Sequence, residues 1–130
     1  MEIKKVLYIE DSTVKMMDVL MYLKSRQGID LIDCVGDTRD AIKSIEDAIW
    51  QNDPYDLLIS DMHFSFFGND DREAGEKTFN ILREKGYTIP VILCSSQNWK
   101  IPGMIGNIFY SPRRDWEQEA DALFKKLRAM

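Results

Sequence analysis

Short apolar runs alternate along this chain with segments in which apolar residues recur every three or four positions. The runs are rich in β-branched, leucine and aromatic residues and end at turn-forming residues, which is typical of buried strands. They predict strands at residues 4–10, 29–35, 56–60, 90–95 and 107–110. The other segments predict helices over about 13–26, 37–49 and 74–85, and a last helix after the turn at Ser111-Pro112. A fifth helical segment is due at 97–106, where Pro102 and Gly103 allow only a short or irregular helix.

This alternation predicts an α/β fold in a single domain, residues 1–130. Strands that alternate with helices pair in parallel, and right-handed crossovers place helices on both faces of the sheet. We expect a five-stranded parallel sheet in the flavodoxin-like order 2-1-3-4-5. Asp30 and Asp33 interrupt the apolar run at 29–35, which indicates that this strand lies at an edge of the sheet.

The sulfur-containing side chains are expected in the core. Met16 and Met17 follow the same helical spacing as Leu20, so we expect these methionines to pack against the sheet. Cys34 and Cys94 fall inside predicted strands that are not neighbours in the expected order. We therefore predict two buried free thiols rather than a disulfide or a metal-binding pair.

Composition and charge restrict the possible partners. The chain has a hydrophobic fraction of 45% and a charged fraction of 30%, as in water-soluble globular domains. Its net charge is −5, with 22 acidic and 17 basic residues and no basic cluster, which argues against nucleic acid or an anionic membrane as a partner. The sequence has no apolar run long enough for a membrane helix and no signal-peptide pattern, so we expect a cytoplasmic protein.

Oxygen-bearing side chains follow three of the predicted strands. Glu10 and Asp11 follow the first strand, Asp61 follows the third, and Ser95 closes the fourth, before Ser96. In the order 2-1-3-4-5 the first and fourth strands both flank the third, so these groups should converge at the carboxyl edge of the sheet. Open α/β sheets bind their ligands at this edge.

The chemistry of this group favours a divalent cation. Carboxylates held close together repel one another unless a positive charge compensates them. Mg²⁺ prefers oxygen ligands and retains positions for water and phosphate, so Glu10, Asp11 and Asp61 form a candidate magnesium site. Asp61 is the central member and is also a candidate nucleophile toward phosphorus, with Ser95 available to hydrogen-bond a phosphoryl oxygen.

These residues resemble those of response-regulator receiver domains of two-component signalling. The resemblance rests on the Glu10-Asp11 pair, on Asp61, and on the segment Pro90-Val91-Ile92-Leu93-Cys94-Ser95-Ser96, and it extends over essentially the whole chain. It implies that Asp61 accepts a phosphoryl group from a histidine kinase or a phosphotransfer protein. It also implies that Mg²⁺ is held by the acidic pair, by Asp61 and by the backbone carbonyl of His63. Ser95 would then contact the phosphoryl group.

Three features depart from the pattern of that family. Ser111 stands before Pro112 where family members carry a lysine, and among nearby basic residues only Arg113 or Arg114 is placed to approach the site. Ile108 stands at the position of the aromatic switch residue. Residues 62–73, with three phenylalanines followed by acidic residues, are longer than the usual turn, and we expect a long irregular loop there.

Three functions remain open from the sequence. The first is a stand-alone receiver that is phosphorylated on Asp61 and switches partner binding, as a monomer or weak homodimer and not as an enzyme acting on other substrates. The second, favoured by Ser111, is a phosphorylation-independent pseudo-receiver that acts as a protein-interaction module. The third is a flavin or nucleotide binder, which the acidic and glycine-free turn at 9–13 disfavours. In a phosphorylated protein without the lysine, we expect the loop 62–73 to carry more of the signal than the last strand.

Overall fold

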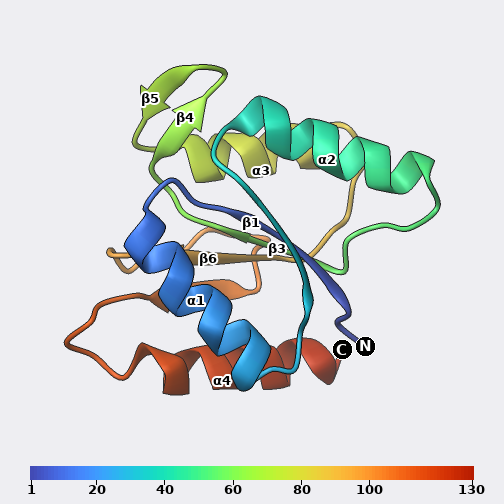
Figure 1. Ribbon diagram of the computed structural model, residues 1–130. Coiled ribbons are helices and arrows are strands. Elements are labelled where there is room, and N and C mark those ends of the chain that lie inside the picture. The colour runs from blue at the N-terminus through green and yellow to red at the C-terminus, as the bar shows by residue number, and fades with distance from the viewer.

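The computed structural model describes residues 1–130 and contains one five-stranded parallel sheet, four helices and a small β-hairpin (Figure 1). The sheet has the order β2-β1-β3-β6-β7. Because β4 and β5 form the separate hairpin, this is the predicted order 2-1-3-4-5. The elements are β1 (Lys5–Ile9), α1 (Thr13–Ser25), β2 (Leu31–Val35), α2 (Thr38–Trp50), β3 (Leu57–Ser60), β4 (Phe64–Phe66), β5 (Asn69–Asp71), α3 (Ala74–Glu84), β6 (Val91–Ser95), β7 (Gly106–Phe109) and α4 (Trp116–Arg128).

The sheet separates two hydrophobic cores. Helices α1 and α4 cover one face and helices α2 and α3 cover the other (Figure 1). Side chains alternate between the two faces along each strand, so Val6 and Tyr8 of β1 belong to the core under α1 and α4, whereas Leu7 and Ile9 belong to the core under α2 and α3. Strands β1, β3 and β6 are buried on both faces, as near-continuous apolar runs require.

Strand β2 lies at the edge of the sheet, as Asp30 and Asp33 predicted. Both cysteines are free thiols, as expected, but only Cys94 is buried. Cys34 is exposed, which corrects the prediction, because an edge strand leaves part of its side chains without a covering helix. The core prediction for α1 also needs correction: Met16 packs against the core, but Met17 is 64% exposed.

Residues 62–73 are not an irregular loop. They form the hairpin of β4 and β5, with Phe66 paired to Asn69 on either side of a two-residue turn. Both turn residues, Phe67 and Gly68, have positive φ angles of 51° and 91°, as turns that match the twist of a hairpin require. Phe64 is fully buried in the core under α2 and α3, so the hairpin is anchored to the domain by its first strand.

Asp37 holds the hairpin against α2. Its carboxylate accepts hydrogen bonds from the Arg39 N–H at 2.7 Å, which caps α2, and from the Ser65 hydroxyl at 2.6 Å and the Gly68 N–H at 2.8 Å. One side chain therefore satisfies a helix terminus and two groups of the hairpin. Partial burial alone would raise the pKa of Asp37, but the hydrogen bonds from Ser65 and Gly68 outweigh this effect and lower it.

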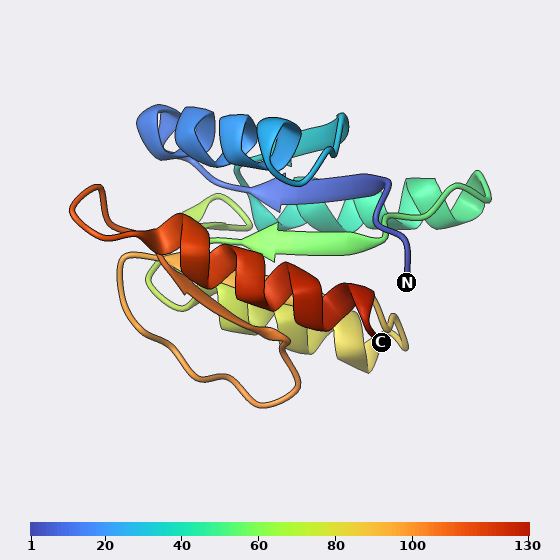
Figure 2. The same ribbon diagram turned by 90° about the horizontal axis from the view of Figure 1, so that it is seen from below.

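The segment between β6 and β7 forms no helix, in agreement with the effect expected of Pro102 and Gly103. Figure 2 shows it as a long excursion away from the sheet. Helix α4 begins at Trp116, after the turn predicted at Ser111-Pro112. None of the helices has both the length and the apolar character needed to cross a membrane.

Candidate functional site

A pocket of about 630 Å³ opens at the carboxyl edge of the sheet, where β1, β3 and β6 end. It receives residues from the predicted strand ends, from the first turn of α1 and from the hairpin. Its lining consists of Glu10, Asp11, Ser12, Lys15, Asp61, Met62, His63, Asp70, Arg72, Ser95, Ser96, Gln97, Trp99 and Tyr110. All five residues proposed from the sequence thus line one pocket.

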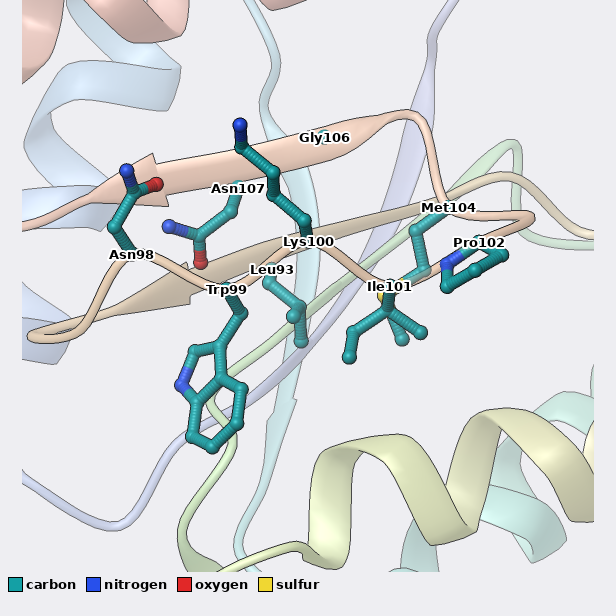
Figure 3. Close-up of a pocket in the computed structure, with 9 residues that line it drawn as sticks. All are labelled: Leu93, Asn98, Trp99, Lys100, Ile101, Pro102, Met104, Gly106 and Asn107. Carbon is teal, nitrogen blue, oxygen red and sulfur yellow. The ribbon is translucent and has the colours of Figure 1, made fainter.

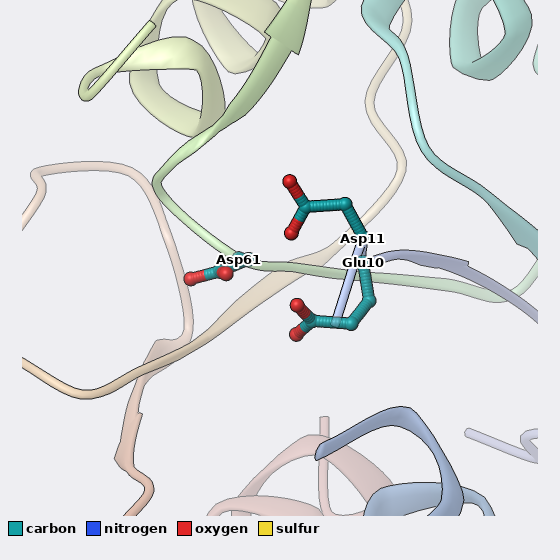
Figure 4. A group of neighbouring side chains, drawn as sticks. All are labelled: Glu10, Asp11 and Asp61. Carbon is teal, nitrogen blue, oxygen red and sulfur yellow. The ribbon is translucent and has the colours of Figure 1, made fainter. Parts of the chain in front are cut away.

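The three predicted carboxylates converge. Glu10, Asp11 and Asp61 each offer an oxygen, and these oxygens lie within 4.8 Å of one another (Figure 4). Their burial differs strongly: Glu10 is 1% exposed, Asp61 is half-buried and Asp11 is exposed. The group is therefore open to solvent on the side of Asp11 and closed on the side of Glu10.

Asp61 has one oxygen engaged and one free. Its Oδ1 accepts a hydrogen bond of 2.7 Å from the Met62 N–H and lies 3.3 Å from the ammonium of Lys15. Its Oδ2 accepts no hydrogen bond from the protein. The side chain is thus oriented through Oδ1, which leaves Oδ2 as the oxygen available for bond formation.

Gly75 allows α3 to approach the end of β3. Its N–H donates a 2.9 Å hydrogen bond to the carbonyl oxygen of Met62. A Cβ at position 75 would lie only 2.4 Å from the carbonyl oxygen of Asp61, a backbone atom with little freedom to move. The close packing that positions the Asp61 backbone therefore depends on glycine at this point.

Glu10 is a buried carboxylate with all its contacts inside the protein. Its Oε1 accepts a 3.1 Å hydrogen bond from the Tyr8 hydroxyl and lies 2.9 Å from the Lys15 ammonium, and its Oε2 accepts one of 3.1 Å from the Ser12 N–H. Burial raises the pKa of Glu10 by more than Lys15 lowers it. Tyr8 is fully buried, and burial together with nearby negative charge raises the pKa of its hydroxyl, so it remains a neutral donor.

Lys15 is the functional candidate that the sequence analysis missed. It lies in the first turn of α1, is 9% exposed, and donates a 2.5 Å hydrogen bond to the carbonyl oxygen of Cys94. The same ammonium lies within ion-pair distance of Glu10 and Asp61. Burial alone would lower the pKa of Lys15, but the surrounding negative groups outweigh this effect and raise it. The ammonium therefore stays charged at neutral pH.

The donor set fits a magnesium ion. Three carboxylates against the single ammonium leave a net negative charge at the pocket, and all three supply the hard oxygen atoms that Mg²⁺ prefers. Asp11 and Asp61 are the more accessible members, and Glu10 is engaged by protein donors on both oxygens. Asp11 and Asp61 are thus best placed for direct ligation, and Glu10 for a contact through water.

The two remaining predicted residues, Ser95 and His63, differ in what their side chains contact. Ser95 ends β6 in the pocket wall, and its hydroxyl oxygen accepts a 3.2 Å hydrogen bond from the Gln97 N–H. The hydroxyl hydrogen of Ser95 is thereby left free to donate. His63 lines the pocket, and its imidazole pairs with Asp70 at 2.8 Å across the hairpin, so the side chain has a partner of its own. The role of its backbone carbonyl as a metal ligand stays a prediction.

No basic residue following β7 reaches the pocket. Arg114 pairs with Glu119 at 3.0 Å and lies over the Phe109 ring, Arg113 is exposed, and Ser111 is not part of the pocket wall. Instead Tyr110 lines the pocket, and its hydroxyl donates a 2.5 Å hydrogen bond to Asp18 of α1. The end of β7 is therefore tied to α1 and not to the carboxylates.

A second pocket has a volume of about 460 Å³, and Figure 3 shows the residues that line it. It is formed by Leu93 of β6, by the β6–β7 segment and by β7, and it shares Trp99 with the acidic pocket. The indole Nε1 of Trp99 and the Oδ1 of Asn107 are buried there without hydrogen-bond partners. Trp99 thus touches both pockets and is one of the three tryptophans that contribute to the fluorescence of the protein.

Comparison with known proteins identifies the fold but gives no match in sequence. No family model matches the chain, and no curated protein matches it in sequence. Among solved structures, the receiver domain of the histidine kinase CKI1 from Arabidopsis thaliana, complexed with Mg²⁺ and BeF₃⁻, matches with a TM-score of 0.67 at 15% identity, covering 98% of this chain and 91% of that one.

Two further structures agree with this result. A two-component response regulator from Legionella pneumophila matches with a TM-score of 0.65 at 20% identity, covering 98% of this chain and 99% of that one. The phosphorylated cyanobacterial phytochrome response regulator RcpA matches with a TM-score of 0.65 at 17% identity, covering 98% and 91% of the two chains. At these identities the matches show a common fold.

Proposed function

We propose that this chain, which has the fold of response-regulator receiver domains, is a magnesium-dependent phosphoacceptor switch whose acceptor is Asp61. The observation that carries this proposal is the geometry of the acidic pocket. Asp61 ends the central strand with its Oδ1 held by the protein and its Oδ2 free, and two further carboxylates lie beside it. The pocket thus holds a nucleophile, candidate metal ligands and a hydroxyl donor.

The proposed reaction is phosphoryl transfer from a phosphohistidine of a kinase or phosphotransfer protein. The Oδ2 of Asp61 attacks phosphorus, an oxygen–phosphorus bond forms, and the nitrogen–phosphorus bond of the donor breaks. The electron pair of the broken bond stays on the imidazole nitrogen, which takes up a proton. The product is an acyl phosphate on Asp61.

The chain's own groups orient the acceptor and receive the phosphoryl group. Met62 N–H keeps the carboxylate in place through Oδ1, and the hydroxyl of Ser95 is positioned to donate to a phosphoryl oxygen. Asp11 and Asp61 would hold Mg²⁺, with Glu10 assisting through water. When bound, the ion neutralises the negative charge that gathers around the transferred group. The chain acts on no other substrate in this proposal.

A phosphorylation-independent interaction module is the second candidate. The observation in its favour is that Lys15 already compensates part of the acidic charge, with contacts of 2.9 Å to Glu10 and 3.3 Å to Asp61. A site stabilised in this way keeps its fold and surface without a phosphoryl group. In such a protein, partner binding would be the same before and after exposure to a phosphodonor.

Intact-mass measurement with a small acyl phosphate and Mg²⁺ separates the two candidates. We expect the purified protein to gain the mass of one phosphoryl group, and Asp61→Asn to gain none. Asp70→Asn is the matched control, because Asp70 lies at the rim of the same pocket but outside the carboxylate group. That variant should be phosphorylated like the parent. A folded parent protein that gains no mass at any magnesium concentration would favour the interaction module.

A further inference from the structure

Lys15 is the only basic side chain within ion-pair distance of Asp61. Its ammonium lies between three oxygen acceptors: Glu10 at 2.9 Å, Asp61 at 3.3 Å and the carbonyl of Cys94 at 2.5 Å. Of these contacts only the one with the Cys94 carbonyl is a hydrogen bond, and those with Glu10 and Asp61 are ion pairs. The contact with Asp61 is the longest of the three.

The other basic groups near the pocket do not have this position. Arg72 lines the pocket, but it is exposed and forms no ion pair. Arg114 is occupied by Glu119, and position 111 carries a serine. Lys15 is therefore the one protein cation that is already in contact with Asp61, and it comes from α1.

Phosphorylation increases the negative charge at the point where Lys15 has its weakest contact. A phosphoryl group adds charge and three acceptor oxygens to the carboxylate. Charge-assisted hydrogen bonds to such oxygens are stronger than the existing contact of 3.3 Å to Oδ1. The ammonium needs only a small displacement to exchange one acceptor for the other, because it already lies inside the pocket.

We propose that Lys15 binds the phosphoryl group of phosphorylated Asp61 and thereby transmits the phosphorylated state to α1. The proposal rests on the function proposed above, in which Asp61 is the acceptor. In this proposal the ammonium that contacts the phosphoryl group comes from Lys15 in the first turn of α1, because the turn after β7 carries Ser111 and no lysine. The hydrogen bond from Tyr110 to Asp18 would couple the end of β7 to α1.

Beryllofluoride binding in the presence of Mg²⁺ tests this assignment, with amide NMR as the main readout and tryptophan fluorescence as a second one. We expect Lys15→Met at saturating Mg²⁺ to bind beryllofluoride at least about tenfold more weakly than the parent, as the loss of one charge-assisted hydrogen bond implies. Lys24→Met is the matched control: it removes the same charge from the exposed last turn of α1 and should leave the affinity unchanged. Magnesium affinity itself should not fall in Lys15→Met, because the variant loses a competing cation.

An unchanged beryllofluoride affinity in Lys15→Met, with tighter magnesium binding, would overturn the proposal and leave Lys15 as a counter-ion of the carboxylates alone. A parent protein that binds no beryllofluoride would instead contradict Asp61 as acceptor, so the two failures are distinct. A measurement on the unaltered chain covers the case of a variant that does not fold. In lysine-labelled protein the Nζ resonance of Lys15 should shift on saturation with beryllofluoride while that of Lys24 does not. A silent Lys15 resonance would also overturn the proposal.

Discussion

Lys15 and Glu10 form an ion pair that is almost completely withdrawn from solvent. The two side chains are 10% and 0% exposed, and their charged atoms lie 2.9 Å apart. Removing one member of a buried pair leaves the other charge without compensation, which costs far more than the pair itself contributes. The stability of the domain should therefore depend on keeping or losing both charges together.

A double-mutant cycle tests this dependence. We expect Lys15→Met to lower the free energy of unfolding by about 3 kcal/mol in the absence of Mg²⁺, because Glu10 loses its cation. The double variant Lys15→Met/Glu10→Gln should recover much of that loss, since the introduced amide still accepts from the Tyr8 hydroxyl and carries no charge to compensate. Urea unfolding of the four proteins gives the coupling energy. Additive losses would show that the two side chains do not act as a pair.

Among single residues, the members of the acidic group are predictable from the sequence, but their cation is not. Glu10, Asp11, Asp61 and Ser95 are recognisable because each follows an apolar strand. Lys15 belongs to a helix, and no strand end points to it. A signal was present: Lys15, Val19 and Tyr22 follow helical spacing, and all three are buried. A lysine is almost never buried without a partner, and this helix begins beside two carboxylates.

Among the elements, the hairpin is the segment for which the sequence-based prediction was wrong. Phe64, Ser65 and Phe66 alternate as a strand should, but the run is only three residues long. The usual hairpin signal is an Asn-Gly or Asp-Gly turn, and here the turn is Phe67-Gly68. A phenylalanine with positive φ is unfavourable in isolation, so only the tertiary contacts of the hairpin explain it.

Asp37 supplies two of those contacts, through Ser65 and Gly68, and its removal should loosen the hairpin against α2. We expect Asp37→Ala to lower the free energy of unfolding by about 2 kcal/mol, since a helix cap and two hydrogen bonds to a charged acceptor are lost. Asp40→Ala is the control: Asp40 lies in the same first turn of α2 and does not contact the hairpin. The amide NMR shifts of β4 and β5 should change in Asp37→Ala and stay unchanged in Asp40→Ala.

The contribution of Asp37 should depend on pH in a defined direction. Its pKa is lowered in the folded protein, so its stabilising effect is complete above the unfolded-state value of about 3.9. The effect is lost as the pH falls through the lower, folded-state pKa. The stability difference between the parent and Asp37→Ala should therefore be constant near neutral pH and disappear in acid. A difference that stays undiminished in strong acid would contradict the assignment.

In the molecule as a whole, the parallel sheet with helices on both faces followed from the alternation of strands and helices, whereas its order is the flavodoxin-like one and does not follow from the alternation alone. The central strands were recognisable because burial on both faces requires continuous apolar runs, as in Val91–Ser95. The exposure of the Cys34 thiol was not predictable from the sequence, because strand propensity does not say which face of an edge strand is covered. The convergence of Asp61 with Glu10 and Asp11 was predictable from topology alone.

The two cores on either side of the sheet differ in size, and we expect the native state to open first on the side with the smaller core. The core under α1 and α4 contains 17 buried residues, and the core under α2 and α3 contains 11. In addition, Tyr22 of α1 binds Asp121 of α4 at 2.7 Å, and Arg26, which follows the end of α1, binds Glu117 of α4 at 2.8 Å. The side with α2, α3 and the hairpin therefore packs on the sheet through a smaller core.

Native-state hydrogen exchange should resolve this asymmetry. We expect the amides of α2, α3 and the hairpin to exchange through a partial opening, at a lower free energy than those of α1 and α4, which should exchange only on global unfolding. Amides of α1 that exchange before those of α3 would contradict this order. The acidic pocket lies on the boundary between the two units, because Lys15 belongs to the stable one and the hairpin to the labile one. A phosphoryl group that engages Lys15 would thus be held by the part of the molecule that opens last.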